Sequence, residues 1–161
     1  MIDDQKMIEM QNIFRENNWT ITCAESCTGG LIASKITEYS GSSDIFRGSI
    51  ITYCNEIKEQ ELGVKKETMI RNGVVSTEVV KEMLEGVIKK FDATWAIAVS
   101  GVAGPNGDTP NKPVGTVVIG VKNTFGFEKI ERYHFNGDRK NVQESAKDRS
   151  LEIIFENLEK F

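Results

Sequence analysis

The chain alternates between stretches with apolar side chains at helical spacing and shorter runs rich in β-branched and aromatic residues. Residues 4–17 carry apolar side chains three and four positions apart, which predicts an amphipathic helix. The same spacing predicts two longer helices, one after Ser76 and one after Asp138. Both of these residues are good helix N-caps.

The shorter runs predict β-strands. They lie at residues 19–21, 46–53, 94–100, 114–121 and 127–135. The third run is almost wholly apolar, which is typical of a strand buried on both faces, whereas the last is polar enough for an edge position. We therefore expect an α/β fold, a three-layer α/β/α sandwich with a mixed, largely parallel sheet. No linker or internal repeat interrupts the pattern, so residues 1–161 are expected to form a single domain.

Composition narrows the class of protein. The 161 residues include 24 acidic and 20 basic side chains, a net charge of −4 that does not indicate a nucleic-acid partner. No apolar run approaches the roughly 18 residues of a membrane span, and the first residues lack the apolar segment of a signal peptide. The sequence therefore predicts a cytoplasmic protein with neither nucleic acid nor membrane as partner.

Residues 22–30 form the stretch around which the chain is organised. They follow a predicted strand and precede a predicted helix, and such turns bind ligands in open α/β folds. Ser26 stands where the strand ends. The helix start offers backbone N–H groups that can bind an anion or an oxyanion. They belong to Cys27, Thr28, Gly29 and Gly30. Tight packing of helix on sheet is the alternative reason for the two glycines.

Lys58 is a candidate base for Ser26. Asn55 is a good N-cap, which places Lys58 at the third helical position, where a cation opposes the helix dipole and loss of its proton is favoured. A neutral lysine can activate a serine where no histidine is available. The single histidine, His134, lies in a predicted strand and is interpreted as structural, which disfavours a Ser–His–Asp triad.

The three cysteines, Cys23, Cys27 and Cys54, do not indicate a disulfide framework, because their number is odd and no signal peptide is present. The absence of a CxxC pair disfavours a zinc site, and we expect no metal. Cys27 remains a rival nucleophile, because a helix start lowers the pKa of a thiol.

A second small-residue loop follows the buried strand, at residues 100–108. Its glycines at three-residue spacing could bring backbone amides close to a phosphate or a carbonyl, although the spacing is not that of a dinucleotide-binding loop. Arg139 opens the last predicted helix, where an arginine is electrostatically misplaced unless an anion binds nearby.

Four segments together resemble the CinA C-terminal domain family, whose enzymatic members are nicotinamide-nucleotide amidases. These segments are residues 22–30 (TCAESCTGG), residues 41–43 (GSS), residues 52–58 (TYCNEIK) with 62–64 (LGV), and residues 100–105 (SGVAGP) with 112–115 (KPVG). The resemblance runs from about residue 5 to the last helix. It implies a stand-alone amidase domain.

The resemblance implies a serine amidohydrolase that converts nicotinamide mononucleotide and water into nicotinic acid mononucleotide and ammonia. Ser26 matches the nucleophile and Lys58 the base, while Tyr53 matches a tyrosine that relays a proton or orients the lysine. The expected substrate-binding residues are Cys27, Thr28, Gly29, Gly30, Ser43, Asn55, Ser100, Gly101, Gly104 and Arg139. The mechanism needs no metal or organic cofactor, and relatives imply a homo-oligomer.

Three positions depart from the family pattern. Cys54 replaces a serine, Asp108 replaces a glycine beside the expected phosphate, and Gln143 replaces an arginine. These departures leave Ser26 and Lys58 untouched but bear on substrate affinity. A non-catalytic nucleotide-binding or interaction domain of the same fold therefore stays open as the alternative function.

Overall fold

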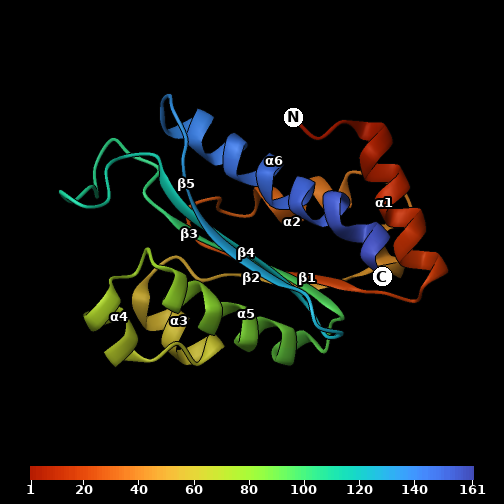
Figure 1. The fold of residues 1–161 in the computed structure, drawn as a ribbon, viewed down its shortest axis with the longest axis horizontal. Helices are drawn as coiled ribbons and strands as arrows, with labels where there is room; N and C mark the ends of the chain where they lie inside the picture. Colours follow the sequence, from red (N-terminus) through yellow and green to blue (C-terminus); the bar gives the residue numbers. More distant parts are fainter.

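The computed structural model describes residues 1–161 as five strands and six α-helices (Figure 1). The strands are β1 (Ile21–Glu25), β2 (Phe46–Ile51), β3 (Trp95–Gly101), β4 (Thr116–Asn123) and β5 (Glu128–His134). The helices are α1 (Asp4–Glu16), α2 (Leu31–Thr37), α3 (Asn55–Leu62), α4 (Lys66–Asn72), α5 (Thr77–Phe91) and α6 (Arg139–Asn157), with short 3-10 turns at Ser42–Asp44 and Leu158–Lys160.

The strands form one sheet in the order β2-β1-β3-β4-β5. β1 is parallel to both β2 and β3, whereas β4 is antiparallel to both β3 and β5. β4 alone therefore runs against the other strands. This confirms the predicted mixed, largely parallel sheet, and the hairpin of β4 and β5 puts β5 at the edge, as its polar sequence indicated.

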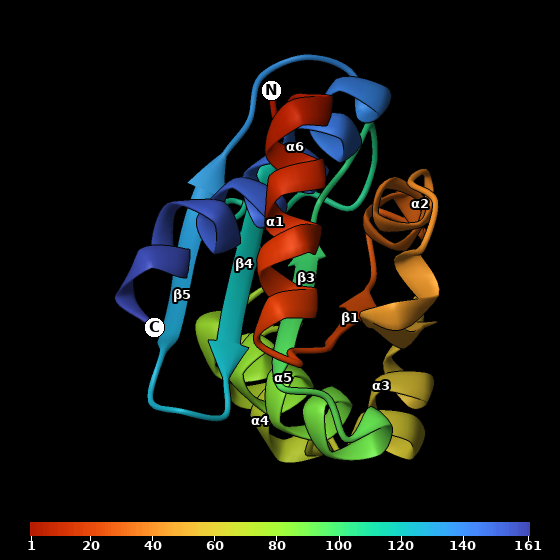
Figure 2. The same ribbon diagram turned by 90° about the vertical axis from the view of Figure 1, so that its right-hand side faces the viewer.

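Helices cover both faces of the sheet, which confirms the three-layer fold class. α1, α2 and α6 lie on one face and α3, α4 and α5 on the other, as the ribbon seen along the sheet shows (Figures 1 and 2). Alternate residues of β3 divide between the two cores: Ile97 packs with the first layer, while Ala96 and Ala98 pack with the second. The small side chains on the second face let α5 approach closely, and a Cβ at Gly120 would lie 2.7 Å from Leu84.

The strand directions bring several connections to one edge of the sheet. β1, β2 and β3 are parallel, so the residues that follow them meet at their shared carboxyl edge. β5 runs the same way, and the link after it returns to this edge before α6 begins at Arg139. The turn after β1, the start of α3, the loop after β3 and the start of α6 therefore converge.

The central strand is longer than the apolar run at residues 19–21 predicts. β1 extends to Glu25, because it pairs with β2 along its length and with β3 over Ile21 to Ala24. Both sides of the backbone are thus hydrogen-bonded, and polar side chains such as Thr22 are carried into the core. Ser26 follows directly, as expected.

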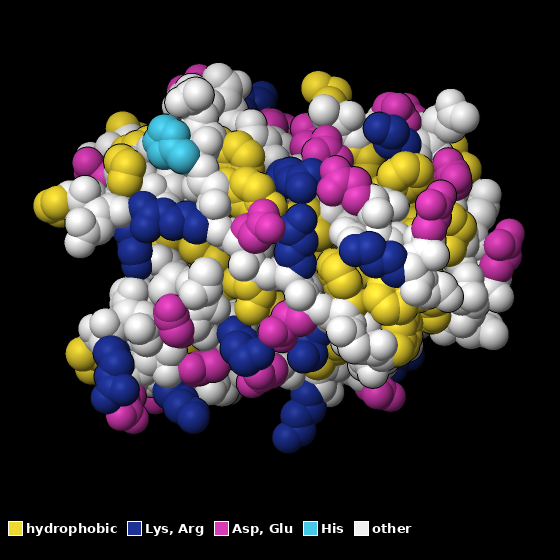
Figure 3. Space-filling model, viewed as in Figure 1, with side chains coloured by type: hydrophobic (Ala, Val, Ile, Leu, Met, Phe, Trp, Pro, Cys, Tyr) yellow, Lys and Arg dark blue, Asp and Glu magenta, His cyan; other side chains and the backbone are white.

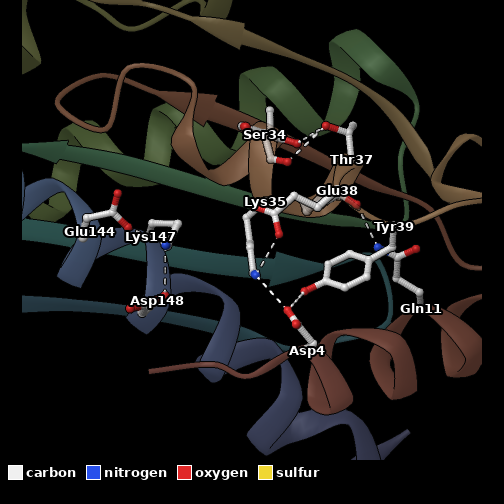
Figure 4. Close-up of polar contacts among 12 residues, drawn as sticks. Asp4, Gln11, Ser34, Lys35, Thr37, Glu38, Tyr39, Glu144, Lys147 and Asp148 are labelled. Atoms are coloured by element: carbon white, nitrogen blue, oxygen red, sulfur yellow. Dashed lines mark hydrogen bonds and ion pairs between the residues drawn. The ribbon is translucent and has the colours of Figure 1, made fainter.

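The helix that follows Ser26 is anchored to α1 at its far end (Figure 4). The carboxylate of Asp4 accepts a hydrogen bond from the Tyr39 hydroxyl at 2.6 Å and one from the Lys35 ammonium at 3.3 Å. The buried Gln11 side chain donates to the backbone carbonyl of Ile36 at 2.8 Å. These contacts hold α2 in place behind the turn.

The surface carries charges of both signs. On the face seen in Figure 3, Lys and Arg side chains are interspersed with Asp and Glu rather than gathered into one field. None of the helices combines the length and apolar character that crossing a membrane requires.

Candidate active site

A cavity of about 250 Å³ opens where the strand ends converge. The predicted site residues that line it are Ser26, Cys27, Tyr53, Asn55, Lys58, Ser100, Gly101, Gly104 and Arg139. They come from the turn after β1, the start of α3, the end of β3 with its loop, and the first residue of α6. Segments far apart in the sequence therefore build one site, as the parallel topology requires.

Ser26 and Lys58 meet inside this cavity. The Nζ atom of Lys58 lies 3.4 Å from Oγ of Ser26, within hydrogen-bond distance. A second contact of 3.4 Å joins Nζ to the backbone carbonyl of Tyr53. Both side chains are buried, with 7% of Ser26 and 1% of Lys58 exposed. A hydroxyl and an amine in this arrangement can exchange a proton.

Burial lowers the pKa of Lys58, because its charged form has lost most of its hydration, while the thiols of Cys54 and Cys27 oppose the change. The helix itself begins one residue earlier than expected: Cys54 is the N-cap, Asn55 is the first helical residue, and Lys58 is the fourth. Lys58 therefore lies one position further from the helix start than expected. Desolvation, rather than the dipole, dominates the pKa of this lysine.

Glu25 is a functional feature that the sequence reasoning missed. Its side chain is fully buried, and its carboxylate accepts hydrogen bonds from the backbone N–H groups of Gly30, Ile32 and Ala33 at 3.0–3.2 Å. It also accepts from the Thr28 hydroxyl at 2.7 Å. The last residue of β1 therefore caps α2, with its negative charge at the positive end of the helix.

This cap changes which amides are free. The expectation that Gly29 and Gly30 offer N–H groups to a ligand is wrong, because Gly29 donates to the Ser26 carbonyl and Gly30 to Glu25. The N–H groups of Cys27 and Thr28 have no acceptor in the protein. Two adjacent donors directly after a serine suit an oxyanion. The two glycines instead provide backbone of positive φ, 59° and 103°, which the turn requires.

The structure disfavours Cys27 as the nucleophile. Burial raises the pKa of its thiol to about 12, and the negative charge of Glu25 adds to this, so the thiolate is scarce at neutral pH. Its sulfur packs where Gly101 leaves room: a Cβ there would lie 3.0 Å from it. Cys27 thus contributes its backbone and its volume to the site.

Tyr53 faces Arg139 rather than the lysine. The phenol oxygen accepts a hydrogen bond of 2.6 Å from Arg139, whose other terminal nitrogen donates to the Gly104 carbonyl, also at 2.6 Å. Arg139 thereby links the start of α6 to two other walls of the cavity. The contact between Tyr53 and Lys58 runs through the Tyr53 backbone carbonyl, which favours the orienting role over the proton relay.

The loop after β3 shapes one wall. The Ser100 hydroxyl is buried and donates to the Val74 carbonyl at 3.0 Å, so it ties this wall to the connection between α4 and α5. A Cβ at Gly104 would lie 2.5 Å from Val114, which explains a glycine there. The remaining lining residues are Val74, Val75, Val102, Ala103, Asn106 and Gly107. The last four belong to the small-residue loop at residues 100–108, whereas nothing local in the sequence marks Val74 and Val75.

Ser43 is a further predicted site residue that the structure places elsewhere. Ser43 lies in the exposed turn before β2, at the amino end of that strand, and outside the cavity. β1 and β2 are parallel, so about five residues of strand, roughly 16 Å, separate it from Ser26. His134 is also outside the cavity and contacts the Val114 carbonyl, which fits its structural interpretation.

Thr28 and Gly29 line a second hollow, of about 560 Å³, on the α6 side of the turn. Arg139 borders both hollows, and Lys140 and Gln143 line only this one. No group of three or more His, Cys, Asp or Glu side chains is arranged to hold a metal ion.

The family of this chain follows from comparison with known proteins. The model of the CinA C-terminal domain matches residues 4–158. The chain belongs to the CinA C-terminal domain family. Among the relatives, a CinA-like protein of Leptospira biflexa is 44% identical over 140 residues, which cover 87% of this chain and 34% of that protein. A CinA-like protein of Thermotoga neapolitana is 42% identical over 163 residues, 99% of this chain and 38% of that protein.

This CinA-family chain thus spans about a third of the length of the curated relatives it matches. Solved structures match it over nearly their whole length. The crystal structure of competence damage-inducible protein A (ComA) from Klebsiella pneumoniae has a TM-score of 0.91 and 32% identity, covering 96% of this chain and 95% of that one. The crystal structure of the competence/damage inducible protein CihA from Agrobacterium tumefaciens has a TM-score of 0.90 and 31% identity, with 97% of both chains covered.

The departures from the CinA family pattern have distinct places. Cys54 is the exposed N-cap of α3. Asp108 is exposed and does not line the cavity, although its neighbour Gly107 does. Gln143 donates from its side-chain amide to the Cys27 carbonyl at 2.9 Å.

Proposed function

We propose that this domain is a serine amidohydrolase that deamidates nicotinamide mononucleotide to nicotinic acid mononucleotide and ammonia. The observation that carries the proposal is the buried contact of 3.4 Å between Lys58 Nζ and Ser26 Oγ. A lysine whose pKa is lowered by burial can act as a base, and a serine beside it becomes a nucleophile. We propose the substrate from the motif resemblance, and membership of the CinA C-terminal domain family supports that choice.

The reaction begins when neutral Lys58 takes the proton of Ser26 and the Ser26 oxygen attacks the carboxamide carbon. The carbonyl oxygen becomes negative and is held by the free N–H groups of Cys27 and Thr28. The carbon–nitrogen bond then breaks. Lys58 returns the proton to the leaving nitrogen, which departs as ammonia and leaves an ester on Ser26.

Water completes the cycle. Lys58, neutral again, takes a proton from water as the oxygen attacks the ester carbon, and Ser26 leaves with that proton. The sum is amide plus water giving acid plus ammonia. No step requires a metal or an organic cofactor. Arg139, a fixed cation at the cavity edge, is the group we assign to the phosphate or ribose of the substrate.

Ammonia release from nicotinamide mononucleotide by the purified protein tests the proposal. Ser26→Ala and Lys58→Met should each abolish turnover while preserving the fold, and the exposed Ser43→Ala serves as a matched control with full activity. Turnover that survives in Ser26→Ala would refute the assigned nucleophile. Binding of the mononucleotide without turnover by the unaltered protein would support the non-catalytic alternative.

A further inference from the structure

Gln143 is the one side chain of α6 that hydrogen-bonds to the turn of Ser26. Its Nε2 atom donates to the carbonyl oxygen of Cys27 at 2.9 Å, and no other hydrogen bond joins residues 26–30 to this helix. Gln143 is half-buried and lines the second hollow rather than the cavity of Ser26 and Lys58. Its hydrogen bond is to the Cys27 backbone, and its side chain does not contact Ser26 or Lys58.

The accepted carbonyl belongs to the same peptide unit as the Thr28 N–H. In a planar trans peptide the carbonyl and the N–H point in opposite directions. The hydrogen bond from Gln143 draws the carbonyl toward α6, so it directs the Thr28 N–H away from α6. This N–H is one of the two donors after Ser26 that have no acceptor in the protein. A hydrogen bond to the carbonyl also polarises the amide and strengthens its N–H as a donor.

The rest of the turn is fixed by other groups. Glu25 holds the N–H groups of Gly30, Ile32 and Ala33, and the Ser26 carbonyl holds that of Gly29. None of these contacts sets the plane of the Cys27–Thr28 peptide directly. Gln143 is the one group of the protein that hydrogen-bonds to the carbonyl or the N–H of this peptide.

We propose that Gln143 is a positioning residue, which aims the Thr28 N–H at the oxyanion formed when Ser26 attacks. The inference rests on the proposed amidohydrolase function. A group that fixes an oxyanion donor acts on the transition state more than on the bound substrate. Loss of Gln143 should therefore lower kcat and leave KM nearly unchanged.

The test compares four variants in ammonia release from nicotinamide mononucleotide. Gln143→Ala should lower kcat about 10-fold, less than the loss from deleting an oxyanion donor itself, with KM within about threefold. Gln143→Glu, an acceptor only, should lose at least as much. Gln143→Arg keeps a donor and should retain kcat within about threefold. Gln5→Ala, an exposed glutamine of α1 without a side-chain hydrogen bond, is the matched control.

A second readout does not depend on the substrate. A fluorophosphonate phosphonylates an activated serine with loss of fluoride and places a phosphoryl oxygen where the oxyanion would lie, and mass spectrometry gives the rate of labelling at Ser26. This rate should fall in Gln143→Ala and Gln143→Glu and recover in Gln143→Arg.

Unchanged kcat and labelling in a folded Gln143→Ala protein would overturn the inference. The inference would also be overturned if Gln143→Arg did not restore kcat and labelling, or if the decrease in Gln143→Ala accompanied a lower melting temperature. Either result would show that the contact is merely structural. Labelling of Ser26 without turnover of the mononucleotide would refute the proposed substrate while the labelling rates still test Gln143. A protein that neither labels nor turns over would refute both.

Discussion

Lys58 places its Nζ atom 3.4 Å from Oγ of Ser26, although 32 positions separate the two residues in the chain. The contact exists because β1 and β2 are parallel neighbours, so the turn after one and the helix after the other begin at the same edge of the sheet. Only 1% of the lysine is exposed. An amine held this way is costly to keep charged, and this cost is what makes it a base.

The rate should therefore depend on pH through Lys58. Its pKa is lowered from 10.5 by burial, so kcat/KM should rise with pH and level off below that value. Lys58→Arg keeps a charge that cannot be lost and should reduce kcat about 10²- to 10⁴-fold. Lys66→Arg, at an exposed position, is the control. A plateau reached only near the ordinary pKa of lysine would contradict the assignment.

The same lowered pKa predicts how stability changes with pH. The folded protein releases the Lys58 proton before the unfolded chain does, so the unfolded chain binds more protons between the two pKa values, and stability rises with pH there. Wild type should gain stability relative to Lys58→Met as the pH rises from the lowered pKa of Lys58 toward about 10, where lysine titrates in the unfolded chain. Melting temperatures of both proteins across this range measure the gain.

Lys35 provides the matched control for that experiment. Burial opposes its charge, but hydrogen bonds with Tyr39, Glu38 and Asp4 outweigh burial and raise its pKa overall. Its contribution to stability is present below its unfolded pKa and is lost only at higher pH. The stability difference between wild type and Lys35→Met should therefore stay constant over the pH interval in which the difference between wild type and Lys58→Met changes. Parallel curves for the two lysines would contradict the lowered pKa.

The two thiols Cys27 and Cys54 should differ in reactivity because one is buried and the other is exposed. Because burial raises the pKa of Cys27 to about 12, iodoacetamide at about pH 8 should leave it unmodified and alkylate the exposed Cys54. Peptide mass spectrometry identifies the modified residue, and Cys54→Ser removes the product. Cys27→Ala should keep most of the amidase activity. If Cys27→Ala lost this activity while Ser26→Ala kept it, the nucleophile would be Cys27 and not Ser26.

The pattern of the sequence was enough to predict the layers and most elements, because each depends on local spacing. The helix face of α1, the Ser76 and Asp138 caps and the buried strand β3 are all confirmed. Ser43 was expected at the site from the family resemblance, and a short polar loop does not itself reveal at which edge of the sheet it lies. That depends on strand direction: Ser43 precedes β2, whereas the site collects residues that follow parallel strands.

Glu25 was missed for a related reason. Rules for helix caps look at the residue directly before the helix, but Glu25 is a strand residue that reaches N–H groups five to eight positions ahead. Only the sharp turn at residues 26–30 makes this contact possible. Val74 and Val75 enter the cavity through tertiary packing, which no local pattern encodes.

Replacing Glu25 should be severe. Glu25→Gln exchanges one acceptor oxygen for an NH₂ group that would face backbone N–H donors, and it removes a negative charge from the start of α2. We expect a loss of about 2–4 kcal/mol in the free energy of unfolding. Chemical denaturation measures it, with the exposed Glu9→Gln as control. A variant as stable as wild type would show that the carboxylate is not needed as a cap.

Tyr53 and Arg139 should act as one unit in substrate binding. The phenol accepts its hydrogen bond from Arg139 and not from Lys58, so Tyr53→Phe frees the guanidinium while leaving the backbone carbonyl that holds the lysine. We expect Tyr53→Phe and Arg139→Ala each to raise KM, and the double variant to raise it by less than the product of the two, because contacting residues are not additive. Steady-state kinetics on nicotinamide mononucleotide give the four KM and kcat values of the cycle.

The split between kcat and KM decides what the tyrosine does. If the Tyr53 hydroxyl passes the proton between Ser26 and Lys58, Tyr53→Phe will lower kcat sharply and Arg139→Ala will not change that loss. If it only fixes Arg139, kcat in Tyr53→Phe will stay within about threefold of wild type, because the Ser26–Lys58 contact does not involve the hydroxyl. The geometry predicts the second result, since one direct hydrogen bond already joins the serine to its base.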